Sequence, residues 1–356
     1  MKKSIITSAA LVMMAMATPA MAQTENVLLI ENGGTGPYKA EMVSDASLPT
    51  HCIYRPQDLQ QVLREQGKIP VILYANGACV NNNVEMRLLL NDLASYGYIA
   101  IAIGPYDERN VSEQWKGVLM SAYPDTKKEC VLANGEVITK PTPEQIAAHQ
   151  AAEKARREAA QAAAAAAKKK SKKAEPAPEP FHTYPKQMLE AMDWITDQNA
   201  NPGSEYYHVI DLDKVAAMGQ SCGGAQTLGV AHDPRIKTCV MLNTGIGDMA
   251  MQGVDKEVLK SLHTPMFYLI GGPVDVAFGN SAKDFERIQD LPVVMINTLD
   301  GHSGTYYEAH GGPYAIAARK WLDWQLKGKV GQSALFLDDE YFAKEHPEWT
   351  IVRKNF

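Results

Sequence analysis

The 356-residue sequence lacks three features that would each indicate a broad class of protein. Beyond residue 22 it has no apolar run long enough to span a bilayer, which excludes a polytopic membrane protein. Basic residues are not in excess, since the formal charge is −6, so nucleic-acid binding has no overall electrostatic support. There is no metal-ligand spacing such as His-Glu-x-x-His. We therefore expect no resident metal or organic cofactor and no nucleic-acid partner.

The first 22 residues have the pattern of a secretory signal peptide. Lys2 and Lys3 precede a short apolar run over residues 5–17, and Ala20-Met21-Ala22 is a small-x-small cleavage site. The run is too short for a spanning helix. We expect the mature chain to be periplasmic or secreted, the alternative being an N-terminal membrane anchor. Such a compartment is oxidising, so disulfides among the five cysteines are expected to persist.

Residues 142–180 differ in composition from the rest of the chain. They contain 15 alanines, which favour helix, and a basic excess concentrated toward residue 173. Residues 175–180 read Glu-Pro-Ala-Pro-Glu-Pro and end any helix in an extended linker. We expect a solvated, low-complexity helical insertion within a single domain that covers residues 23–356. The alternative is a basic arm that touches anionic envelope polymer or lipid.

Outside the insertion, apolar runs alternate with amphipathic segments. Some runs are continuously apolar, as expected for strands buried on both faces. The expected strands are 40–44, 51–55, 70–75, 98–103, 214–218, 237–242, 265–270 and 292–297. The expected helices are 83–96, 184–199, 222–231 and 313–326. This alternation predicts an α/β fold with a mostly parallel eight-stranded sheet and helices on both faces. The first two strands have no helix between them, so the sheet should begin antiparallel.

A Gly-x-Ser-x-Gly motif lies between an expected strand and an expected helix. Residues 214–218 form the apolar strand, and Gly219-Gln220-Ser221-Cys222-Gly223 follows directly. A serine on such a sharp turn stands clear of the sheet, with the first amides of the next helix beside it. Ser221 is therefore the candidate nucleophile. An ordinary Gly-rich turn that happens to contain serine is the alternative.

A nucleophilic serine needs a base, and the base needs an acid that orients it. On this architecture both follow the serine, each in a loop after a later strand. Asp275 and His302 stand in those positions, with Asp284 and Asp300 as rival acids and His310 as rival base. We expect His302 to be the base because it is nearer to the end of its strand.

Two backbone amides should stabilise the oxyanion that forms on the attacked carbonyl. We assign them to Cys222, which follows the nucleophile, and to Ala78 in the loop Asn76-Gly77-Ala78-Cys79. If both amides point at one oxygen, Cys79 and Cys222 lie within the range of a disulfide. We expect this bond, or a close approach of the two cysteines, and we expect Cys239 to be a buried free thiol.

The chain resembles the α/β-hydrolase superfamily in its strand–turn–helix motif and in the order of its Ser, Asp and His. It is more closely similar to the dienelactone-hydrolase and polyester-hydrolase-like branch of secreted esterases. The resemblance covers about residues 33–330 without the insertion, and it rests on the motifs at 76–79, 219–224, 301–306 and 321–328. The insertion is a departure from the family pattern.

Together, the motifs predict a secreted serine hydrolase that cleaves carboxylic esters through a Ser221-His302-Asp275 acyl-enzyme mechanism. Its substrate would be an ester, either a small molecule or one carried on a polymer, and we expect the protein to act as a monomer. Three other functions stay open. The first is amide or peptide cleavage by the same residues. The second is an envelope-associated binding protein with little catalytic power, and the third is an adhesion or scaffold role centred on the basic arm.

Overall fold

The computed structural model describes residues 23–107, 130–131, 137–138 and 182–356. The predicted signal peptide over residues 1–22 and the predicted insertion over residues 142–180 lie outside the described residues, so both stay predictions. Within the part of the chain that is described, no helix has the length and hydropathy needed to cross a bilayer.

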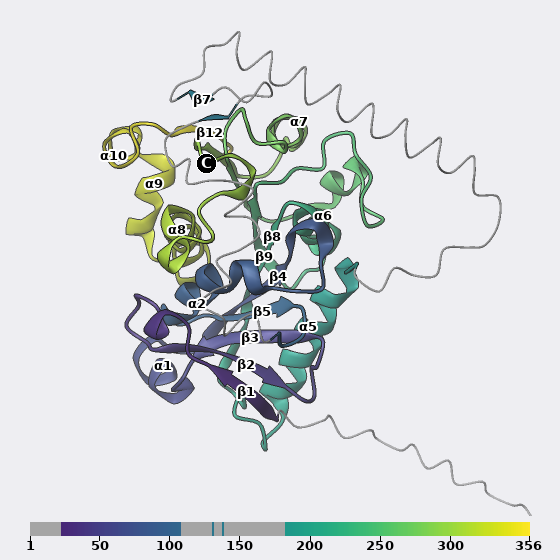
Figure 1. The fold of residues 1–356 in the computed structure, drawn as a ribbon, viewed down its shortest axis with the longest axis vertical. Helices are drawn as coiled ribbons and strands as arrows, with labels where there is room; N and C mark the ends of the chain where they lie inside the picture. The colour runs from purple at the N-terminus through teal and green to yellow at the C-terminus, as the bar shows by residue number, and fades with distance from the viewer. Residues whose placement is uncertain (1–22, 108–129, 132–136, 139–181) are drawn as a thin grey trace, which may run out of the picture.

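A mixed sheet of ten strands forms the centre of the fold (Figure 1). In spatial order the strands are β1 (Thr24–Leu28), β2 (Ala40–Asp45), β3 (His51–Pro56), β5 (Ile99–Ile103), β4 (Ile69–Ala75), β8 (Ile210–Gln220), β9 (Ile236–Leu242), β10 (Met266–Ile270), β11 (Val293–Asn297) and β12 (Thr350–Lys354). The six from β5 to β11 in this order are parallel. The remaining pairs are antiparallel. The predicted α/β fold with a mostly parallel sheet is confirmed, including its antiparallel start.

The predicted count of eight strands is wrong, because the described sheet has ten. All eight predicted segments form strands, and β1 and β12 are added at the two edges. Both edge strands are partly exposed, with Val27 60% and Val352 42% accessible. Because an edge strand is covered on fewer sides, it need not be apolar along its whole length: β1 starts with three polar residues and β12 ends with two basic ones. A separate antiparallel pair is formed by β6 (Cys130–Val131) and β7 (Val137–Ile138).

Helices cover both faces of the sheet (Figure 1). The described α-helices are α1 (Leu59–Gln66), α2 (Arg87–Ser95), α5 (Pro185–Ala200), α6 (Cys222–Val230), α7 (Phe278–Arg287), α8 (Gly312–Lys327), α9 (Ala334–Leu337) and α10 (Asp339–Glu345). One apolar cluster joins the sheet to α1, α5, α6 and α7. A second joins its other face to α2, α8, α9 and α10. The four predicted helices are present, at bounds close to those expected.

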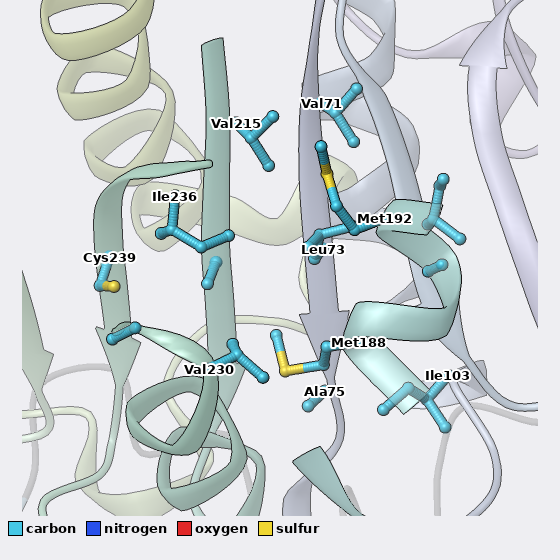
Figure 2. Close-up of a cluster of buried hydrophobic side chains, with 14 of the residues drawn as sticks. Val71, Leu73, Ala75, Ile103, Met188, Met192, Val215, Val230, Ile236 and Cys239 are labelled. Carbon is cyan, nitrogen blue, oxygen red and sulfur yellow. The ribbon is translucent and has the colours of Figure 1, made fainter. Parts of the chain in front are cut away.

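Strand β4 shows how the two clusters hold the middle of the sheet. Val71, Leu73 and Ala75 face the first cluster, where α5 packs over them (Figure 2). The intervening Ile72 and Tyr74 face the second cluster. All five side chains are fully buried. A strand packed on both faces has little freedom, so the loop at its carboxyl end starts from a fixed position.

Deleting residues 144–180 is expected to leave the melting temperature of the protein unchanged, because residues 159–173 have no apolar stripe to pack. The deletion should stop before His182, since His182 pairs with Val80 and Thr183 donates its amide to Cys79 O over 2.9 Å. The measurement is thermal unfolding of the deletion variant, closed by a short Gly/Ser linker, against the full chain. A large drop in melting temperature would show that the segment packs on the domain.

Candidate active site

Four of the predicted site residues lie just beyond the ends of strands at one edge of the sheet, and the fifth, Cys222, begins helix α6 beside them. Strands β4, β8, β10 and β11 are parallel, so their carboxyl ends point the same way. Ala78 follows β4, Ser221 follows β8, Asp275 follows β10 and His302 follows β11. In open parallel sheets this edge is where ligands bind.

Ser221 occupies a tight turn between β8 and α6. Its φ of 51° lies in the left-handed region, which is uncommon for a residue with a side chain. The backbone is held from strand β9, since the Ser221 amide donates to Leu242 O over 3.0 Å and Thr244 Oγ1 donates to Ser221 O over 2.6 Å. The turn also needs a glycine at 223, because any side chain there would collide with the Ala75 carbonyl at the end of β4. The strained turn is thus fixed from two neighbouring strands.

The structure brings Ser221, His302 and Asp275 into one hydrogen-bonded row. His302 Nε2 lies 2.9 Å from Ser221 Oγ, and His302 Nδ1 lies 2.7 Å from Asp275 Oδ1. The His302 side chain is 24% exposed, whereas that of Asp275 is fully buried. A ligand can therefore reach the serine and histidine while the carboxylate stays shielded from solvent.

Asp275 is charged in spite of its burial. Desolvation by burial would raise the pKa of Asp275. The interaction with His302 outweighs this effect, together with the hydrogen bonds from the Ala277 amide and the Asn243 side chain. The pKa of Asp275 therefore lies below its ordinary value. Both oxygens are occupied by donors: Oδ1 accepts from Ala277 N over 2.8 Å, and Oδ2 from Gly271 N over 3.0 Å. An ionised carboxylate only accepts hydrogen bonds. His302 therefore donates from Nδ1, which leaves Nε2 free to accept from the serine hydroxyl.

His310 and Asp284 lie away from the row of Ser221, His302 and Asp275, whereas Asp300 lies close to it in sequence. His310 Nδ1 is 3.2 Å from Glu31 Oε2 and 3.8 Å from Asp92 Oδ1. Asp284 lies in α7 and accepts the amides of residues 246 and 247 over 2.7 and 2.8 Å. Burial raises the pKa of Asp284 to about 6. Asp300 belongs to the loop of His302, and its amide donates to Thr298 Oγ1 over 3.2 Å.

The loop after β4 lies against the start of α6. Ala78 and Cys79 both have positive φ, 50° and 51°, in a short 3₁₀ turn over Gly77–Cys79. Cys79 and Cys222 form a disulfide with their Cα atoms 5.2 Å apart, as predicted. The prediction of a buried free thiol at Cys239 is also confirmed. Cys222 is the first residue of α6 and Ala78 is the second residue of the 3₁₀ turn, positions at which a backbone amide has no partner within its own helix. The assignment of both to an oxyanion hole stays a prediction.

Two buried amide side chains that the sequence analysis did not single out support the site. Gln226 Nε2 lies 3.0 Å from Cys79 Sγ and 2.8 Å from Thr183 Oγ1, which ties α6 to the loop after β4. Asn243 Nδ2 donates to Asp275 Oδ2 over 2.7 Å. Asn243 could have been suspected, because it is a polar residue directly after an apolar strand at the same sheet edge. Gln226 lies inside a helix and carries no such signal.

Removing the Cys79–Cys222 disulfide with the double variant Cys79→Ala/Cys222→Ala is expected to lower the free energy of unfolding by about 2–5 kcal/mol, because the bond closes a loop of 143 residues. Denaturant unfolding of oxidised and reduced wild type, with peptide mapping of the bond, is the measurement. The double variant controls for other effects of the reductant, because the reductant should destabilise the wild type and leave the variant unaffected. Equal stability of oxidised and reduced wild type would contradict the expectation.

Among the described residues, no group of three or more His, Cys, Asp or Glu is placed to hold a metal ion. Comparison with known proteins finds no family model that matches this chain and no curated protein that is similar to it.

Proposed function

We propose that the protein is a secreted or periplasmic serine hydrolase of the α/β-hydrolase fold that cleaves carboxylic esters. The observation that carries the proposal is the row of Ser221 Oγ, His302 and Asp275, joined over 2.9 and 2.7 Å at the carboxyl edge of the parallel sheet. The strained φ of 51° at Ser221 adds to it, because strained residues cluster at functional sites.

In the proposed reaction, Ser221 Oγ forms a bond to the acyl carbon while its proton moves to His302 Nε2. The negative charge on the carbonyl oxygen is stabilised by the amides of Ala78 and Cys222. The intermediate collapses, the bond to the leaving oxygen breaks, and His302 returns its proton to the leaving alcohol. Water then attacks the acyl-enzyme with His302 as base, which releases the acid. Asp275 holds the imidazole in the required tautomer throughout.

The disulfide supports the proposed location, because such bonds persist in oxidising compartments. It also bears on the chemistry. Cys222 directly follows the nucleophile and Cys79 directly follows Ala78, so the bond joins the two segments that would supply the oxyanion amides. Donors fixed in place before the reaction stabilise developing charge most effectively. The proposed substrate is a small or polymer-borne ester, with the protein acting as a monomer.

A fluorophosphonate probe tests the proposal on the purified mature chain. We expect covalent labelling at Ser221, located by peptide mapping, and hydrolysis of p-nitrophenyl acetate by the same sample. Parallel assays with matched amides, and with esters of graded acyl length, separate esterase from amidase activity. A folded protein that neither reacts with the probe nor hydrolyses any ester would favour a binding protein instead.

A further inference from the structure

Residues 242–244, where strand β9 ends, contact Ser221, Asp275 and the residue before His302. Leu242 O accepts the Ser221 amide over 3.0 Å, and Thr244 Oγ1 donates to Ser221 O over 2.6 Å. Between these two, Asn243 is fully buried and has a φ of 46°. Asparagine is among the few residues with a side chain that tolerate this backbone conformation. Its side chain is therefore held at the sheet edge, between the loops of the acid and the base.

The Asn243 amide group joins those two loops directly. Nδ2 donates to Asp275 Oδ2 over 2.7 Å and to Gly301 O, next to His302, over 2.9 Å. The acid and base loops also touch each other, since the Gly301 amide donates to Gly271 O over 3.0 Å. The contact is so close that any side chain at Gly271 would collide with the Gly301 carbonyl. A movement of either loop would thus change the hydrogen bonds of Asn243.

A tyrosine completes the hydrogen bonding of the Asn243 amide group. The Asp275 carboxylate and the Gly301 carbonyl only accept hydrogen bonds, so they require the Nδ2 side of the amide. The Tyr306 hydroxyl donates to Asn243 Oδ1 on the other side, and the Tyr306 side chain is buried. The Tyr306 ring packs edge-on against Tyr314 of α8, with centroids 5.3 Å apart. The Asn243 amide group is thus hydrogen-bonded at both its nitrogen and its oxygen.

We propose that Asn243, supported by the hydrogen bond from Tyr306, is a positioning residue that sets the carboxylate of Asp275 and the loop of His302 for proton transfer. The expected effect on kcat rests on the proposed hydrolase function, whereas the positioning of Asp275 and the loop of His302 does not. Asn243 acts through Asp275 and Gly301 and is not expected to touch substrate. Its loss should therefore slow the chemical step and leave substrate binding nearly unchanged.

The test compares Asn243→Gly and Tyr306→Phe with a control, Asn297→Ala. Glycine removes the Asn243 side chain and still adopts a φ of 46°, whereas alanine would add backbone strain. Asn297 ends strand β11, two strands away from β9 at the same edge, and within the described residues its Oδ1 has no hydrogen-bond partner. We expect Asn243→Gly to lower kcat on p-nitrophenyl acetate about 10–100-fold with little change in KM, because small misplacements of catalytic groups are costly. Tyr306→Phe should give a smaller loss of the same kind. Asn297→Ala should keep the wild-type kcat.

A second measurement does not depend on turnover. The proton between His302 Nδ1 and Asp275 should give a low-field NMR resonance in the wild type. This resonance should shift or disappear in Asn243→Gly and persist in Asn297→Ala. If this response occurs in a protein that hydrolyses no ester, the positioning role stands and the hydrolase proposal fails. An unchanged resonance and unchanged kcat in folded Asn243→Gly would overturn the positioning role. If Asn243→Gly does not fold, the same two readouts on Tyr306→Phe decide.

Discussion

Replacing Ser221 by alanine is expected to lower kcat/KM on p-nitrophenyl acetate by at least about 10³-fold, the scale seen when a member of a catalytic triad is removed. The change deletes one oxygen, which lies 2.9 Å from His302 Nε2. The backbone hydrogen bonds stay in place, because Ser221 N still donates to Leu242 O and Ser221 O still accepts from Gly224 N, so the fold should be unaffected. The residual rate would come from binding and from the oxyanion amides alone.

A matched control for this variant is Ser261→Ala. Ser261 is a serine whose Oγ donates to Val258 O at an exposed position, so its loss should change neither stability nor turnover. Thermal unfolding of both variants shows that any loss of activity is chemical. Retained hydrolysis by folded Ser221→Ala would remove Ser221 from the mechanism, and labelling by the fluorophosphonate should vanish in the same variant.

Most of the sheet and the placement of the candidate site could be predicted from the sequence, because each rests on a strong local signal. Strands such as β4 are buried on both faces and so read as unbroken apolar runs. Loops after parallel strands must share one edge, so the order of Ser221, Asp275 and His302 along the chain was enough to bring them together. The proximity of Cys79 and Cys222 followed from the same geometric reasoning.

The features that could not be predicted depend on tertiary contacts. Edge strands β1 and β12 are partly exposed, and each has only two apolar residues among its five, so neither has the pattern of a buried strand. Gln226 is a polar residue inside a buried helix, where sequence pattern alone shows no partner. The role of Asn243 depends on Asp275, Gly301 and Tyr306, which are 32, 58 and 63 residues away along the chain. Such a role becomes visible only when the side chains are placed.

Replacing His302 by asparagine is expected to lower kcat/KM by about 10³-fold or more, whereas His310→Asn should keep it close to the wild-type value. His302 Nε2 lies 2.9 Å from Ser221 Oγ, whereas His310 faces the carboxylates of Glu31 and Asp92 at 3.2 and 3.8 Å. Asparagine is the matched replacement because His310 has a φ of 57°, which asparagine tolerates and alanine does not readily adopt. Activity is compared at equal melting temperature, with the rate of fluorophosphonate labelling as a second readout that needs no turnover. If His310→Asn lost turnover and labelling while His302→Asn kept them, His310 would be the base. The hydrogen-bonded row of Ser221, His302 and Asp275 would then not carry the reaction.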